Sequence, residues 1–366
     1  DVCSSDLGTD IDNQPGFQNS PAVGGLALEF YRRVSAHYHR EAAFEEMLRT
    51  KLKATGLWRF EPHVAESVFD AWVKEAGVKV LRGHRLKERD GVTKDGARIA
   101  ALHFENGATV RAKVFIDATY EGDLLAFTGI GFAVGREGNA KYGESFNGIQ
   151  YDAKYKPRSE HLVPGVNGRV KGGQGVWDRD FPLDPYVVLG CPDSGVLPLI
   201  EIDDVGRPGD PAPGVQAYCY RLCLTTAADR LPITPPADYD AKTYEIVARF
   251  IEACLQNGDD MDLRWFSKHD PLPNDKWDFN TATFGGNLPG ASHAWPEATY
   301  AQREKIAKDH ENYHRGLLHF LATDKRVPEK VRGDMQRFGL PKDEFADTHG
   351  WPHQLYIRRS EERRVG

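Results

Sequence analysis

The chain has 366 residues, which is enough for one large domain or two smaller ones. Its composition, with 40% hydrophobic and 28% charged residues, is that of an ordinary globular protein. The net charge of -7 argues against a general nucleic-acid-binding protein, and no apolar run approaches the length of a membrane-spanning helix. We therefore expect neither nucleic acid nor a membrane as a partner.

The two ends of the chain differ in character from the rest. Residues 1–7 (DVCSSDL) and 359–366 (RSEERRVG) resemble translated sequencing-library adapters. On this interpretation residues 8–358 are the genuine sequence, a fragment cut at both ends. Without a natural N-terminus, nothing can be concluded about export, so we make no prediction of localisation.

Amphipathic helices are predicted in the first quarter of the chain. Apolar residues recur at helical spacing from Leu26 to Tyr38, and a second such pattern covers residues 61–76, where Gly77 marks the end. Residues 78–81 (VKVL) then indicate a short strand. Three hairpin-like strands follow, HRLKERD, ARIAALHF and ATVRAK, separated by turn signals at residues 90–91, 95–96 and 106–107.

The most informative segment comes directly after this β-meander. Residues 114–116 (VFI) predict a buried strand that ends at Asp117, Ala118 and Thr119. In an open α/β sheet, ligands bind at the carboxyl ends of such strands. The order of strand, meander and buried strand therefore predicts a ligand site after residue 117.

This region resembles a family of FAD-dependent oxidoreductases in which a strand ends in DAT-x-x-GDL and a VGRE…YGES.NG segment follows. Tyr120 departs from the many related flavoproteins that have Gly at this place, and Gly122 would supply the close backbone approach instead. Further blocks match in the same order: AVGGLALEFYRRV (22–34), FEPHVAESVF (60–69), DPYVV (184–188), VQAYCYRLCLT (215–225) and GWPHQLYIR (350–358). The resemblance implies FAD as the cofactor and a small-molecule substrate.

The same resemblance implies an α/β fold with two parts. A Rossmann-like FAD/NAD(P)-binding domain with a β-meander is expected at residues 8–135, and an α+β substrate domain at residues 136–358. The first βαβ unit with its Gly-rich phosphate-binding turn is missing, since residues 165–175 are Gly-rich but no helical pattern follows them. We therefore expect this fragment to bind FAD weakly or not at all, and to be inactive by itself.

The family resemblance and the strand-end rule together predict the FAD contacts. Near the diphosphate and ribityl chain we expect Asp117, Ala118, Thr119, Glu121, Gly122 and Asp123, and the backbone of Val80 is expected at the adenine. Gly8, Thr9 and Asp10 are expected near the flavin ring.

Candidate catalytic residues come from the second half of the chain. His353, in GWPHQLYIR, and His293, in GASHAWPEA, are candidate bases for the substrate proton, with a structural histidine as the alternative for each. Arg221 is a charge inside an apolar strand pattern, so it is either a structural ion pair or an anchor for a polar substrate. Cys219 and Cys223 have the pattern of small core residues, and no metal site is predicted.

The second half is otherwise predicted from periodicity and composition. Residues 215–226 indicate a long strand, and helices are expected at residues 239–255, 296–323 and 328–338. The segments 131–214 and 259–292 have no clear period and are expected to be irregular.

Two other classes of function remain open at this stage. The 7 Trp and 14 Tyr, together with acidic loops, suit a carbohydrate-binding or carbohydrate-hydrolysing protein. A non-catalytic scaffold that retains the fold is the other alternative. For the oxidoreductase, hydride transfer between a polar organic substrate and the flavin is expected, with a sugar-like molecule as one candidate.

Overall fold

The computed structural model describes residues 7–9, 11–12, 18–145, 147–149, 183–200, 206–212, 214–280, 282–288 and 290–357. The predicted flavin contact Asp10 and the Gly-rich segment 165–175 lie outside the described residues.

The N-terminal part of the chain is helical. It contains α2 (Gly25–His37), α3 (Glu41–Thr50) and α4 (Pro62–Glu75), which confirms both helices expected from periodicity. Gly77 follows α4 with φ +67°, a conformation that suits glycine at a helix end. The helices enclose a small core of aromatic rings, in which Phe30 and Phe60 meet edge to face at 5.3 Å.

The β-meander forms a three-stranded antiparallel sheet of β1 (Val92–Asp95), β2 (Arg98–His103) and β3 (Thr109–Val110). The turns at residues 95–96 and 106–107 are confirmed, and both of their glycines have positive φ. The segment HRLKERD is shorter as a strand than expected and contributes only the bridge between Leu86 and Phe104.

The two strands expected on either side of the meander are wrong. Residues 78–81 and 114–119 have no strand assignment, and the side chains of Val114 and Ile116 are 73% and 83% exposed. A buried parallel strand needs neighbours on both sides for its backbone hydrogen bonds. Both sheets in the described part of the chain are antiparallel, and neither includes these segments.

A second antiparallel sheet lies in the other half of the molecule, with the order β4-β6-β5. Its strands are β4 (Leu222–Thr225), β5 (Lys268–Leu272) and β6 (Lys276–Asn280). The long strand expected at residues 215–226 is a strand only over β4, and Tyr218 and Cys219 before it form isolated bridges. The hairpin β5–β6 falls in a segment expected to be irregular.

Three helices pack against this sheet: α7 (Glu245–Gln256), α8 (Tyr300–Thr323) and α9 (Glu329–Gln336). All three were expected, but α7 and α8 begin later than predicted. The first residues of each pattern form short 3-10 helices, and α8 starts at a capping box in which Thr299 and Gln302 exchange hydrogen bonds. Two short helices, α5 (Asp123–Phe127) and α6 (Asn139–Tyr142), follow the meander.

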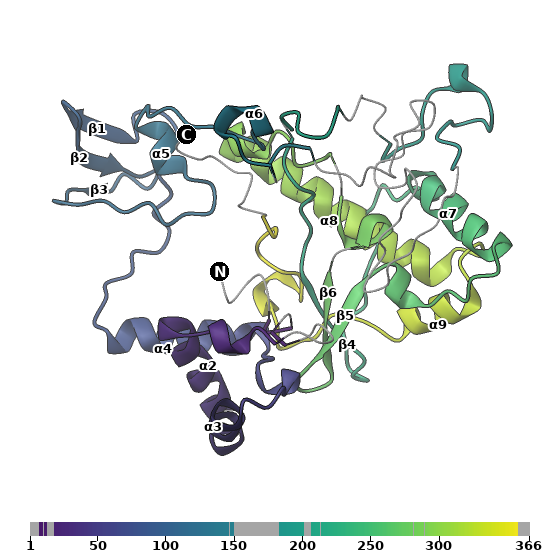
Figure 1. Ribbon diagram of the computed structural model, residues 1–366, viewed down its shortest axis with the longest axis horizontal. Helices are drawn as coiled ribbons and strands as arrows, with labels where there is room; N and C mark the ends of the chain where they lie inside the picture. Colours follow the sequence, from purple (N-terminus) through teal and green to yellow (C-terminus); the bar gives the residue numbers. More distant parts are fainter. Residues whose placement is uncertain are drawn as a thin grey trace.

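The sheet β4-β6-β5 has packed residues on both faces. Leu222, Leu224 and Phe279 belong to the large core with α7, α8 and α9, whereas Cys223 and Leu272 belong to the core of α2, α3 and α4. Figure 1 shows the N-terminal helices below and to the left of this sheet, the meander above them, and α8 running across the top. The N-terminal helices and the second sheet therefore share a packed interface.

Among the described helices, none combines the length and the apolar character that crossing a bilayer would require.

Candidate functional site

The face of the second sheet that meets the N-terminal part carries an unusual number of charges. Asp278 lies opposite Asp270 and Cys223 in the two strand pairings, so all three share this face. Arg221, Lys268, Asp270 and Asp278 are all buried. Buried charges must be paired, and here the pairing partners come from three different strand segments.

Arg221 and Asp278 form the centre of this polar cluster. The Nε atom of Arg221 donates to Oδ1 of Asp278 at 2.9 Å, and its Nη2 atom donates to Oδ2 at 2.5 Å. Lys268 pairs with Asp270 at 3.2 Å. The ring of Tyr356 lies 5.9 Å from the Arg221 guanidinium carbon. Arg221 is therefore held in a buried ion pair, one of the two alternatives that its sequence context left open.

Thr9 connects the cluster to the first residues of the described chain. Its hydroxyl donates to Oδ2 of Asp278 at 3.0 Å and accepts from Nη2 of Arg221 at 3.0 Å and from Nζ of Lys268 at 3.4 Å. A hydroxyl has one hydrogen and two lone pairs, so these contacts use its full capacity. The segment expected near the flavin ring is thus fixed to the sheet that carries Arg221.

A second polar cluster lies beside the first, around Lys276 of β6. Its ammonium is within 2.6–2.8 Å of carboxylate oxygens of Glu61, Asp343 and Glu344. Burial disfavours the ammonium charge, but hydrogen bonds to the three carboxylates outweigh burial and raise the pKa of Lys276 above its ordinary value. Glu344 also contacts His63 at 2.7 Å and raises the pKa of that imidazole.

These acidic groups and His63 have the composition of a metal site, and their ligand atoms lie within 4.8 Å of one another. The three carboxylates already have a positively charged partner, the ammonium of Lys276. The cluster therefore joins the start of α4, strand β6 and the segment at residue 343 by ion pairs. We do not propose a metal site there.

The loop after residue 116 keeps its own hydrogen bonds although it follows no strand. The carboxylate of Asp117 accepts from the backbone N of Thr119 at 3.0 Å, from its hydroxyl at 2.6 Å and from the backbone N of Leu125 at 3.1 Å. Burial opposes ionisation, yet these bonds prevail and lower the pKa of Asp117. Gly122 has φ +66° and precedes α5.

Asp123 forms an ion pair with an arginine of α8. Its two carboxylate oxygens accept from Nη1 and Nη2 of Arg303 at 2.8 and 3.0 Å, and both side chains are buried. Arg303 also donates to the backbone oxygens of Trp295 and Pro296. This bidentate pair fastens the start of α5 to the first turns of α8.

The remaining predicted FAD contacts lie in different surroundings. A Cβ atom at Gly8 would come within 1.9 Å of the Trp58 carbonyl oxygen, so this glycine is needed for packing against the N-terminal core. Val80 is 52% exposed and belongs to no strand. Ala118 is exposed and Glu121 is half-buried, both in the loop before α5.

The two candidate bases occupy separate places. Nδ1 of His293 accepts from the backbone N of Val215 at 3.1 Å, and Gly214 packs directly on the ring. His353 is exposed, and its Nε2 atom lies 2.7 Å from Oδ1 of Asp347. The described contacts bring neither histidine to the Arg221 cluster.

Sequence reasoning missed Asp278, Lys268 and Asp270 because their segment was expected to be irregular. A signal was present: Asn274 and Asp275, both with positive φ, stand between KHDPL and KWDFN. Pro271 sits on an edge strand, where a missing N–H is tolerated. The alternation of inward and outward side chains was not recognised as a strand pattern, because charged residues are not expected on a buried face.

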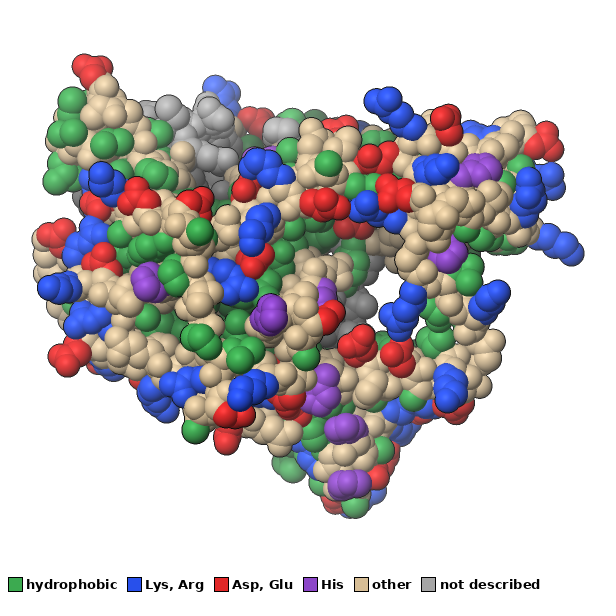
Figure 2. All heavy atoms as spheres, turned by 180° about the vertical axis from the view of Figure 1, so that it is seen from behind, with side chains coloured by type: hydrophobic (Ala, Val, Ile, Leu, Met, Phe, Trp, Pro, Cys, Tyr) green, Lys and Arg blue, Asp and Glu red, His purple; other side chains and the backbone are tan. Residues whose placement is uncertain are grey.

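The residues present fit an FAD group in part. The loop of Asp117, Thr119 and Gly122 is accessible and tightly turned, which suits contacts to a polar cofactor chain. Gly8 and Asp123 are occupied by protein contacts instead. Figure 2 shows a hollow between the meander side of the molecule and the rest, with basic and acidic side chains interspersed over the described surface on that face.

Comparison with known proteins gives one result. The sequence model of the family described as FAD dependent oxidoreductase matches residues 2–366. Searches among curated proteins and solved structures returned no match.

Proposed function

Because the chain belongs to the FAD dependent oxidoreductase family, whose cofactor is FAD, we propose that it transfers hydride between a polar organic substrate and the flavin. The isoalloxazine ring supplies the redox chemistry when it is bound, and the protein binds and orients the reactants. Asp117, Ala118, Thr119, Glu121 and Gly122 would line the cofactor chain. The roles of Val80, Gly8, Asp10 and Asp123 remain predictions.

The observation that carries the proposal is the attachment of Thr9 to the sheet of the second half. In a flavoenzyme the flavin and the substrate must meet, so the flavin-facing segment has to adjoin the part that holds the substrate. Thr9 bonds to Arg221, Lys268 and Asp278, residues more than 200 positions away. In this proposal Arg221 acts as a positioning residue, since it orders Thr9 both by a direct hydrogen bond and through Asp278.

His353 remains the better candidate for the base that accepts the substrate proton. Its contact with Asp347 fixes the orientation of the ring, as an acidic partner does for many catalytic histidines. Its exposure leaves the other ring nitrogen open to a substrate. His293 is less suited, because its Nδ1 atom is engaged by the backbone of residue 215.

The alternative of a carbohydrate hydrolase has less support. Hydrolysis needs two carboxyl groups free to act as acid and as base or nucleophile. In the polar cluster, both Asp270 and Asp278 are paired with cations. A sugar-like molecule is instead a candidate substrate of the proposed oxidoreductase.

The proposal is tested by reduction of the flavin. The protein in excess FAD would be mixed anaerobically with sugars, polyols and hydroxy acids, and bleaching of the flavin absorption followed. Thr9→Val should slow bleaching by about tenfold and shift the flavin midpoint potential, because Arg221 and Lys268 lose an acceptor. Thr9→Ser should restore both, and Thr50→Val, on the exposed end of α3, should change neither.

Three results would count against the proposal. If the protein takes up FAD but no polar compound bleaches it, the assigned reaction is wrong. If Thr9→Val leaves the rate and the potential unchanged, the polar cluster does not adjoin the flavin. If no FAD stays on the protein after free FAD has been removed by gel filtration, the assigned cofactor contacts are wrong.

A further inference from the structure

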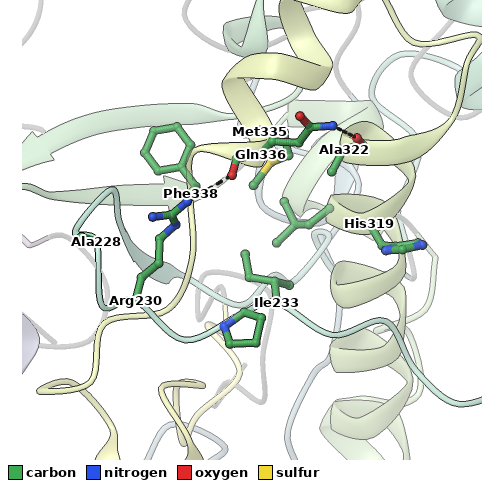
Figure 3. A pocket seen from close by; sticks show the side chains of 10 residues that line it. Ala228, Arg230, Ile233, His319, Ala322, Met335, Gln336 and Phe338 are labelled. Carbon is green, nitrogen blue, oxygen red and sulfur yellow. Dashed lines mark hydrogen bonds between the residues drawn. The ribbon is translucent and has the colours of Figure 1, made fainter.

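A separate cavity of about 410 Å³ opens between the loop at residues 228–233 and the helices α8 and α9. Figure 3 shows this pocket, with Arg230 and Phe338 on one side and His319 of α8 on the other. Its volume lies within the range of small-molecule sites, about 300–1,000 Å³. None of the residues assigned to the flavin or to the polar cluster lines it.

The wall of the pocket combines apolar side chains with polar groups and is held in place by the backbone. Ile233, Leu318, Met335 and Phe338 contribute apolar side chains to the lining, and Arg230, His319 and Gln336 contribute polar ones. The loop is fixed by two backbone hydrogen bonds, in which Leu231 and Leu340 each donate to the other at 2.8 and 2.9 Å. The pocket is therefore formed before any ligand binds.

Arg230 places a positive charge in this wall. Its guanidinium donates to the backbone oxygens of Ala227 at 3.0 Å and Gln336 at 3.5 Å. Among the described residues no carboxylate pairs with it, and the adjacent Asp229 is 3.4 Å from Lys342. A half-buried guanidinium without an acidic partner favours an anionic ligand, preferably a carboxylate that matches its planar fork.

The position of Arg230 depends on the lack of a side chain at residue 339. A Cβ atom at Gly339 would come within 2.8–2.9 Å of the Arg230 side-chain carbons. The aliphatic stem of Arg230 therefore lies directly over this glycine. This packing restricts the guanidinium, so it can bind a ligand group with less loss of side-chain entropy.

We propose that this pocket binds a small amphipathic carboxylate, with its apolar body against Ile233, Leu318, Met335 and Phe338 and its carboxylate on Arg230. The site is distinct from the proposed flavin site. Phe338 packs on Trp277 and Phe279 of β6 at ring distances of 5.4 and 4.9 Å. Trp277 and Phe279 flank Asp278 along β6, so their side chains lie on the opposite face of the strand from Asp278. The pocket and the polar cluster are therefore on opposite sides of β6.

The test uses octanoate and its uncharged analogue octanamide with the full chain. Binding would be measured by isothermal titration calorimetry without FAD, so the result does not depend on the oxidoreductase proposal. Octanoate should bind about tenfold more tightly than octanamide, because only the carboxylate pairs with the guanidinium. Arg230→Gln should abolish this preference, whereas Arg230→Lys should keep part of it.

A matched control is Arg264→Gln, which removes an exposed arginine paired with Asp262 and should leave octanoate binding unchanged. Thermal melting of each variant would show that the fold is retained. Equal affinity for octanoate and octanamide would overturn the proposal, as would unchanged octanoate binding in Arg230→Gln. Absence of any heat of binding at millimolar octanoate in the parent protein would overturn it as well.

Discussion

Replacing Asp278 by Asn tests whether the buried polar cluster holds the two halves of the molecule together. Asp278 is 0% exposed and accepts hydrogen bonds from Arg221 and Thr9. Asparagine has nearly the same shape, so the substitution removes the charge with little change in packing. One of its side-chain positions becomes an NH₂ donor, which would face the donors of Arg221 or Thr9.

The expected loss follows from what the substitution leaves behind. The Arg221 side chain is only 6% exposed, so it would lose, inside the protein, the carboxylate with which it forms an ion pair. Removing one partner of a buried ion pair typically destabilises a protein by about 3–5 kcal/mol. The pair of Asp260 with Lys330 is exposed and contributes far less, so Asp260→Asn is the matched control.

Urea unfolding followed by tryptophan fluorescence would measure the change in the free energy of unfolding. Asp278→Asn should move the midpoint to much lower urea, with the slope unchanged if unfolding stays cooperative. A separate early transition of the N-terminal part would also agree, since the cluster links that part to the sheet. A loss no larger than that of Asp260→Asn would refute the reasoning.

Two further predictions concern α8 and its surroundings. Burial lowers the pKa of His314 to about 4, so between pH 4 and 6.5 the unfolded chain binds a proton that the folded protein does not. The free energy of unfolding should therefore fall by roughly 3 kcal/mol as the pH drops through this window. Urea titrations of His314→Gln should show a much smaller fall. An identical pH dependence in the variant would contradict the assignment. Gly316→Ala would place a Cβ atom 2.1 Å from the Tyr244 hydroxyl oxygen and should destabilise the protein by about 1–3 kcal/mol. At Gly333 a Cβ atom would have nothing within 4 Å, so Gly333→Ala should stabilise the protein by up to about 1 kcal/mol. Similar thermal midpoints for these two glycine variants would show that the packing at α8 is not as tight as described.

The clusters around Asp278 and Lys276 also explain how the two halves of the chain are joined. Cys223 and Leu272 of the second sheet make apolar contact in the N-terminal core. Polar contacts add to this: Arg221 donates a hydrogen bond to Thr9, and Lys276 forms an ion pair with Glu61. Charge pairing, which is directional, therefore contributes to the relative position of the halves.

The amino-acid pattern correctly predicted several features that depend on neighbouring residues. The helices α2, α4, α7, α8 and α9 follow from apolar spacing, and the turns of the meander follow from Asp-Gly and Asn-Gly pairs, because each of these signals acts within a few residues. The DATYEGDL block and the other motifs indicated the family that the whole-chain match then showed.

Which segments form strands, and where the buried charges lie, depends on contacts between distant parts of the chain. The apolar run at residues 114–116 has the composition of a buried strand, yet a strand exists only when another backbone accepts its hydrogen bonds, and the described chain provides none there. Conversely, β6 is the central strand of its sheet although two charged residues, Lys276 and Asp278, lie on one of its faces. Those charges are tolerated because Glu61, Glu344, Arg221 and Thr9 reach them from distant parts of the chain, and a local pattern carries no information about such partners.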